Sequence, residues 1–129
     1  MSYMQYAPSP DGYMKPGLKQ VPRIIPITMI CGNTFCLKLK LKNIEPTAIY
    51  FTVRGQFGRK GFSKSLEDGI SSIGDGVYLV RIAPEDTAQL TPAIYFYDCD
   101  ICVGDDMYTP FGGSFRLLKD IATAGCDDD

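Results

Sequence analysis

Apolar and polar side chains alternate along most of the chain after Arg23, and this period of two constrains the fold more than any other feature. Successive side chains of a strand point to opposite faces of a sheet, so the pattern marks strands with one face in a core. The clearest run covers residues 34–41, where Lys38 and Lys40 occupy one side. Its other side carries Phe35, Leu37, Leu39 and Leu41.

Six further segments show the same alternation, with turn residues between them. The expected strands are residues 24–30, 34–41, 48–54, 62–66, 77–82, 93–103 and 108–118. Pro26 makes the first an edge strand, because proline cannot donate to a ladder, and the glycine pair at 112–113 predicts a bulge in the last. Residues 84–90 form the only helix-like segment, which is one turn long. About seven short strands predict an all-β, antiparallel sandwich, with a closed barrel as the competing architecture.

The chain divides into three expected parts. Residues 1–22 hold four prolines, which exclude a helix or a central strand. Two interpretations of this segment stay open: a disordered leader, or an extended N-terminal arm whose Tyr3, Tyr6 and Tyr13 grip a neighbouring subunit. Residues 23–120 form the sandwich, and residues 121–129 a flexible acidic tail. At 129 residues, a second core would leave both too small to be stable.

The chain contains no histidine, which excludes Ser-His and Cys-His nucleophile pairs and His-ligated metals. Carboxylate or lysine chemistry remains open. Five cysteines without an export signal predict free thiols in a reducing cytoplasm. A zinc site would need Cys31 and Cys36 to meet Cys99 and Cys102, but alternation places the last two on opposite faces of one strand. We therefore expect no metal, no cofactor and no enzymatic activity.

Charge is divided unevenly along the chain: basic residues dominate 38–64 and acidic residues dominate 85–106. Lys38 and Lys40 belong to one predicted strand, whereas Phe96, Asp98 and Asp100 share one side of another. If these strands lie in different sheets, the domain has a basic and an acidic side. We take these five residues as candidate protein contacts, through which copies associate head to tail, the alternative being two solvated faces. The pI near 5.0 disfavours nucleic acid, and no apolar run is long enough for a membrane helix.

Three segments carry a family resemblance. Residues 74–90, 92–98 and 107–115 contain, in order, the patterns GxYxVxIxPEDTAxL, PxxYxYD and YTPxxGxF. They resemble the immunoglobulin-like N-terminal domain of phage baseplate upper proteins and related small virion proteins of phages and prophages, over about residues 24–118. The resemblance implies an immunoglobulin-like sandwich that is made in the host bacterial cytoplasm and assembles into a virion, at the baseplate, tail, neck or head. Its partners would be other virion proteins and copies of itself.

One local pattern supports this sandwich, and one competing function remains. Leu90 followed five residues later by Tyr95 resembles a tyrosine corner, in which the hydroxyl bonds to nearby backbone and pins a connection between sheets. The alternative function is a bacterial cell-surface or carbohydrate-binding module. That function needs exposed aromatics, for which Tyr50, Phe96 and Tyr108 are the candidates, and the absence of tryptophan weakens it.

Overall fold

Ten strands and one short helix make up most of what the computed structural model describes, namely the backbone of residues 2–6 and all of residues 23–41 and 43–119. All seven predicted strands are present, the first of them divided in two, and the short helix lies where it was predicted. The elements are β1 (Ser2–Tyr6), β2 (Arg23–Ile24), β3 (Ile27–Ile30), β4 (Phe35–Lys40), β5 (Ala48–Arg54), β6 (Phe62–Leu66), β7 (Gly69–Gly74), β8 (Val77–Ile82), α1 (Pro84–Thr87), β9 (Ala93–Val103) and β10 (Asp106–Leu118).

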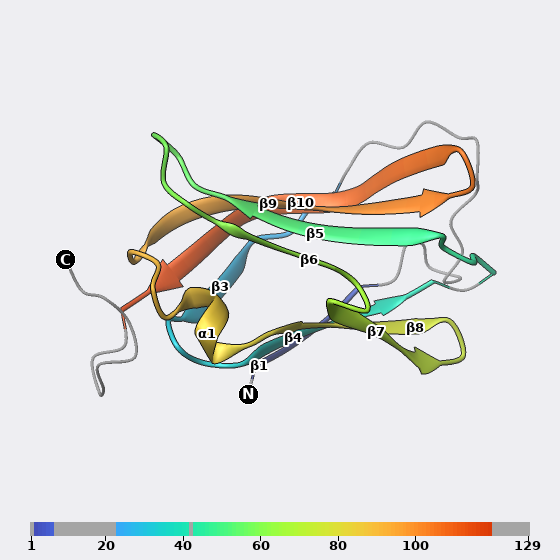
Figure 1. Cartoon of the computed structure of the whole chain (residues 1–129), viewed down its shortest axis with the longest axis horizontal. Helices are drawn as coiled ribbons and strands as arrows, with labels where there is room; N and C mark the ends of the chain where they lie inside the picture. The colour runs from blue at the N-terminus through green and yellow to red at the C-terminus, as the bar shows by residue number, and fades with distance from the viewer. Residues whose placement is uncertain (1, 7–22, 42, 120–129) are drawn as a thin grey trace.

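The strands form two layers with the core between them (Figure 1). One layer has the order β4–β8–β7 and the other β6–β5–β9–β10. In an immunoglobulin sandwich, strands B, E and D form one sheet, and strands C, F and G, extended by C′, form the other. Assigned in chain order, β4 to β10 take the positions B, C, C′, D, E, F and G. The immunoglobulin-like fold class therefore follows from the strand order itself.

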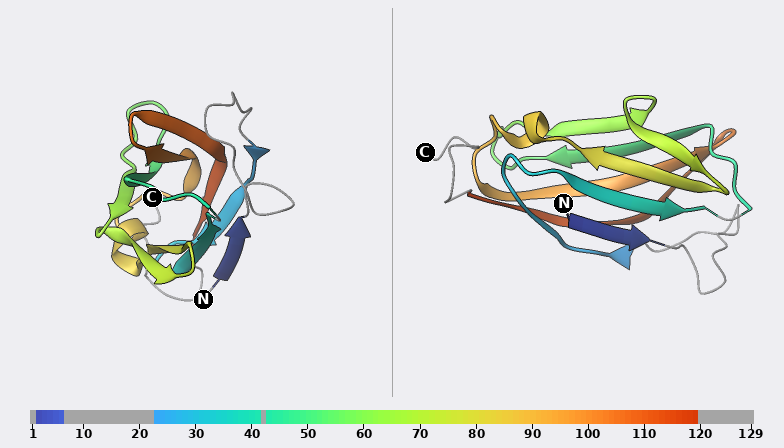
Figure 2. Two further views of the ribbon diagram at one scale, coloured as in Figure 1. Left: turned by 90° about the vertical axis from the view of Figure 1, so that its right-hand side faces the viewer. Right: turned by 90° about the horizontal axis from the view of Figure 1, so that it is seen from below.

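The two layers are joined along one side by a short parallel pairing of β6 with β7, and Figure 2 shows the resulting curl end-on. Within the described residues, no ladder joins the opposite ends of the sheet at β1 and β2. The described strands therefore curl without closing into the competing barrel. β1 lies parallel to β4, at the edge of the sheet, so part of the predicted arm is a strand of the domain itself.

The first predicted strand is interrupted where proline occurs. β2 and β3 flank Pro26, and both run parallel to β10. Because proline has no N–H, the ladder is broken there, while the Ile25 N–H still donates to the Gly112 carbonyl oxygen at 2.8 Å. The predicted sandwich is confirmed, and the structure adds parallel pairs at β1–β4, β6–β7 and along β10, so the sheet is mixed.

The bulge in β10 lies elsewhere than predicted. The register against β9 shifts between Tyr108 and Phe111, where the intervening proline cannot donate to the ladder, and not at the glycine pair 112–113. The glycines have a different role. Gly113 has a φ of 155°, and a Cβ there would meet the Ile25 carbonyl oxygen at 3.0 Å. Glycine thus allows the segment before β3 to cross close to β10.

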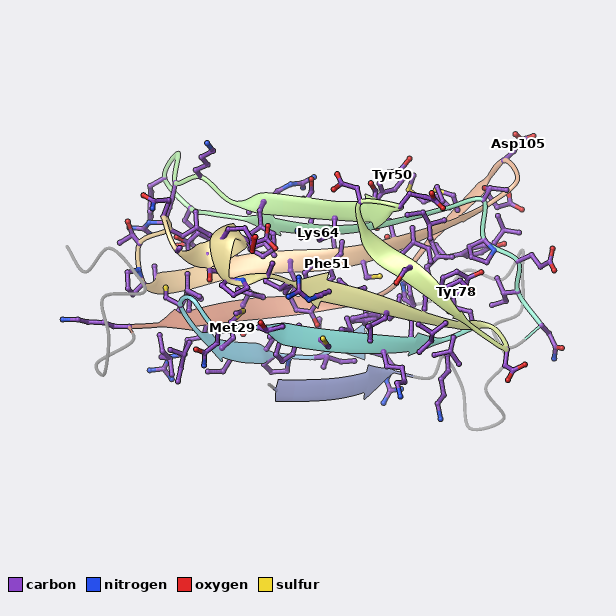
Figure 3. The ribbon with its side chains drawn as sticks, turned by 60° about the horizontal axis from the view of Figure 1, so that its bottom comes forward. Met29, Tyr50, Phe51, Lys64, Tyr78 and Asp105 are labelled. Atoms are coloured by element: carbon purple, nitrogen blue, oxygen red, sulfur yellow. The ribbon has the colours of Figure 1, made fainter. Side chains whose placement is uncertain are left out.

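Aromatic side chains from the β5–β9–β10 side fill the centre of the core. Tyr97 stacks on Phe51 with ring centroids 5.2 Å apart, and its edge contacts Phe111 at 6.0 Å. Figure 3 shows Phe51 between the layers and Tyr50, the preceding residue, at the outer side. Opposite them, β4 and β8 contribute mainly aliphatic side chains, among them Leu37, Leu39, Val80 and Ile82.

The described part of the chain contains no helix that could cross a membrane.

Candidate protein-interaction surface

The β6–β5–β9–β10 layer has one side turned away from the core, which we call the outer face. Tyr95, Tyr97 and Cys99 of β9 are buried, so the residues between them point outward, as the alternation predicted. Strand pairing then identifies the side chains next to them. The outer face consists of Tyr50, Thr52 and Arg54 from β5, Ile94, Phe96, Asp98 and Asp100 from β9, and Ser114 and Arg116 from β10.

Large apolar side chains on this face are open to solvent. Ile94 is 52% exposed, Phe96 47% and Tyr50 44%. Phe96 lies at the middle of a cross-strand row, with Arg54 on one side and Ser114 on the other. The backbone of β9 is paired on both edges, so little backbone entropy remains to be lost when these side chains bind a partner.

Asp98 and Asp100 lie beside this apolar group and differ in their surroundings. Asp100 accepts a hydrogen bond from the Thr109 hydroxyl at 2.6 Å. Asp98 is half-buried between Thr52 and Gly112, and its Oδ1 is covered without a hydrogen-bond partner. Burial raises the pKa of Asp98 above its ordinary value, the neighbouring Asp100 raises it further, and Arg54 offsets part of the rise.

Charge is separated along the outer face. Arg54 and Arg116 lie toward the end where β9 begins, and Asp98 and Asp100 lie toward the β9–β10 turn. Figure 3 shows Asp105 at the tip of that turn. The predicted acidic side is therefore corrected: the face carries both signs, because strand pairing brings arginines from β5 and β10 next to β9.

Lys38 and Lys40 belong to the other layer, on β4, as the sequence predicted. Lys40 is exposed and Lys38 half-buried. β1 runs beside them, with Tyr3 opposite Cys36 and Tyr6 opposite Leu39 in the backbone register. The side chains of β1 and all of Tyr13 lie outside the described residues. The candidate contacts thus fall on two separate surfaces.

Tyr95 has the geometry of a tyrosine corner. Its side chain is buried, and its hydroxyl donates to the Thr91 carbonyl oxygen at 2.7 Å, four residues upstream. Leu90 is buried at the same connection, and its N–H donates to the Thr87 carbonyl oxygen. These contacts attach the connection between β8 and β9 to the core.

The short helix α1 makes two contacts that the alternation pattern did not reveal. The Asp86 carboxylate accepts from the Ala83 N–H at 2.7 Å and forms an ion pair with Lys64 of β6 at 2.6 Å. Thr87 is fully buried, and its hydroxyl accepts from the Gly32 N–H at 2.9 Å. The only signal for them in the sequence is the PEDT segment itself, where an acid three residues into a short helix favours capping.

The cysteines are spread through the fold. Cys99 is buried in the core and Cys102 lies on the other side of β9, as predicted, and both are free thiols with Cys36. Cys31 is disulfide-bonded, which corrects the expectation of a free thiol there. Burial raises the pKa of the Cys99 thiol, so it stays protonated. Among the described residues, no three potential ligands from His, Cys, Asp and Glu come together as a metal site.

The aromatic residues considered for carbohydrate binding do not share one face. Tyr50 and Phe96 lie on the outer face, but Tyr108 is half-buried and packs against the core. Its partner across the ladder is the buried Ile101, so it points inward. The outer face therefore offers two of the three rings that this alternative needs.

No protein-family model matches this chain, and no curated protein matches it either. Among solved structures, the N-terminal domain of phage TP901-1 ORF48 is similar at a TM-score of 0.45 and 11% identity, over 93% of this chain and 99% of that one. The extracellular portion of mouse CD200RLa is similar at a TM-score of 0.38 and 13% identity, over 77% and 56% of the two chains. At these values, neither likeness supports an inference about function, and the immunoglobulin-like assignment rests on the strand order.

Proposed function

We propose that this chain is a non-enzymatic structural protein of a phage or prophage virion, where it acts as a protein–protein assembly or adaptor module. Its site on the particle would be the baseplate, tail, neck or head, and its partners other virion proteins and copies of itself. The family resemblance over residues 74–115 supports the virion part of this proposal. The outer face supports the assembly part.

The observation that carries the assembly role is the group of exposed apolar side chains on an ordered sheet. An antiparallel sheet that faces water on one side normally alternates apolar inside and polar outside. Here Ile94, Phe96 and Tyr50 project from the outer side instead. Ile94 and Phe96 are neighbours on β9, and Tyr50 lies opposite Asp100. Exposed apolar side chains next to charged residues are typical of protein–protein contacts.

The chemistry of the chain fits binding better than catalysis. Without histidine, the usual proton carrier at neutral pH is missing. The two carboxylates on the outer face, Asp98 and Asp100, lie on a sheet surface between exposed side chains. A carbohydrate-binding role is less well supported, because Tyr108 packs inward.

Analysis of purified particles tests this function. Phage production is induced in cells that carry the gene, particles are banded on a density gradient, and each fraction is quantified by mass spectrometry. We expect the chain to band with the particles at a constant ratio to the major capsid protein. If it stays in the soluble fractions while the capsid protein bands, the virion proposal is wrong. A purified host enzyme of similar size, added before the gradient, controls for trapping.

A further inference from the structure

The outer face is self-complementary in charge, which points to its own copy as a partner. Arg54 and Arg116 are exposed at one end, and Asp98 and Asp100 lie toward the other. Along the strands, Phe96 lies level with Arg54, between the row of Arg116 and the row of Asp98. Within the described part of the chain, neither arginine lies within salt-bridge distance of a carboxylate. Arg54 lies close enough to Asp98 of its own chain to lower the pKa of that carboxyl, but it forms no ion pair with it, so both arginines can still pair with carboxylates of another copy.

Two faces of identical molecules can stack in two ways related by a twofold axis between them. If the axis runs along the strands, Arg54 lies over the arginine end of the second copy, and like charges repel. If the axis runs across the strands, between the rows of Phe96 and Asp98, the ends are exchanged. Arg54 then approaches Asp98 of the second copy, and Arg116 approaches its Asp100. Charge complementarity therefore selects the second arrangement, with the strands of the two copies antiparallel.

We propose that two copies of this chain pair face to face through their outer faces, with the twofold axis between the rows of Phe96 and Asp98, so that both arginines of each copy face the aspartates of the other. The inference rests on the proposed function of the outer face as a protein-binding surface. It replaces the head-to-tail association between a basic and an acidic side, because one face carries both signs.

The size of the face suits a dimer of modest affinity. β9 has 11 residues, so at about 3.3 Å per residue it is roughly 36 Å long, and four strands at about 4.8 Å spacing span roughly 19 Å. Because β5 and β6 are shorter, the usable area is on the order of 600 Å² per copy, at the lower end of stable interfaces. We therefore expect dissociation in the micromolar range, with weaker pairing at high salt.

Reciprocal charge reversal tests the arrangement by sedimentation velocity at low salt. The basic-end variant is Arg54→Glu/Arg116→Glu, and the acidic-end variant is Asp98→Asn/Asp100→Lys. Each variant alone places like charges over each other, so its dissociation constant should rise at least tenfold above that of the wild type. An equal mixture of the two restores opposite charges at both ends. It should form a mixed dimer at least tenfold tighter than either variant with itself.

A matched control reverses two exposed basic residues on the other layer, Lys40→Glu/Arg81→Glu, and should leave the dimer intact. Thermal unfolding establishes that each variant is folded. If the acidic-end variant does not fold, Phe96→Asp supplies a second test, since this side chain is already 47% exposed and its loss opens no core cavity.

The proposal is overturned by a monomeric wild type at a few hundred micromolar and low salt, by outer-face variants that dimerise as well as the wild type, or by a mixture that fails to pair. Dissociation by the control variant would overturn it as well, and would favour the β4 side. The particle experiment is independent of this result. A monomeric chain that bands with virions leaves the proposed function standing, and a dimer absent from virions refutes the function alone.

Discussion

The hydrogen bond of Tyr95 provides the clearest test of what holds the two layers together. Tyr95→Phe removes only the hydroxyl that donates to Thr91 at 2.7 Å and keeps the ring in the core. A typical intramolecular hydrogen bond stabilises a protein by about 1 kcal/mol, and a carbonyl left without a donor adds to the loss. Thr91 is half-buried, so water reaches its carbonyl only in part. We expect the free energy of unfolding to fall by about 1–2 kcal/mol.

Urea unfolding followed by tyrosine fluorescence measures this loss. For a domain of this size, a loss of about 1 kcal/mol corresponds to roughly 3–5 °C in Tm, so thermal unfolding should fall by about 3–10 °C. The matched control is Tyr78→Phe, the same deletion at a half-buried tyrosine whose hydroxyl makes no hydrogen bond within the described residues. That variant should stay within about 0.5 kcal/mol of the wild type.

The same variant has a pH signature. Burial raises the pKa of Tyr95 above its ordinary value of 10.0. In the unfolded chain the tyrosine ionises at about pH 10, while in the folded protein it is still neutral. The advantage of the wild type over Tyr95→Phe is therefore complete below pH 10 and declines as pH rises toward the raised value. Equal urea midpoints at pH 7, or an equal loss in the Tyr78→Phe control, would refute the role given to this hydroxyl.

Three further changes test other contacts. Lys64→Met removes the ion pair with Asp86 and should lower the free energy of unfolding by about 1 kcal/mol. A double-mutant cycle with Asp86→Asn measures the coupling energy between the two side chains, and a value of zero would contradict this prediction. Thr87→Val leaves the Gly32 N–H without its acceptor and should lower the free energy of unfolding, measured in urea, by about 1–2 kcal/mol. Thr87→Ser keeps the hydroxyl and should retain most of this stability. Equal losses in the two variants would argue against the hydrogen bond. Asp98→Asn should stabilise the isolated domain at pH 7 by on the order of 1 kcal/mol, since a raised carboxyl pKa favours folding only while the group is protonated. This gain should vanish as pH falls below the ordinary carboxyl value, and a gain independent of pH would count against the cause given.

The alternation of apolar and polar residues predicted most of the strands, because it can be recognised within each strand without knowing the neighbouring strands. It missed β7, whose Gly-Ile-Ser-Ser-Ile-Gly sequence has little intrinsic preference for extended structure. β7 forms because β8 pairs with it along one edge, with Ile70 buried opposite Val80. The bulge in β10 was misplaced for a related reason: glycine signals a departure from regular backbone but does not say whether a bulge or a close crossing requires it.

The surface itself was predictable only in part. Alternation along β9 placed Phe96, Asp98 and Asp100 on one side, and that side is the outward one. Sequence could not show that Arg54 and Arg116 lie next to them, since these residues are 42 and 20 positions from Phe96 and belong to other strands. The prediction of a wholly acidic side failed because it considered each strand without its neighbours.

The sequence by itself determined the strand segments, the all-β class and the residues that point together within each strand, because these depend on the local geometry of an extended chain. Only the tertiary structure decided which strands are neighbours, in which direction they run and in which register. Those choices depend on contacts between distant residues, such as Tyr97 against Phe51 and Phe111 in the core. Because of these choices, the acidic strand β9 lies between two strands that carry arginines, so the outer face has charges of both signs. The proposed pairing depends on this.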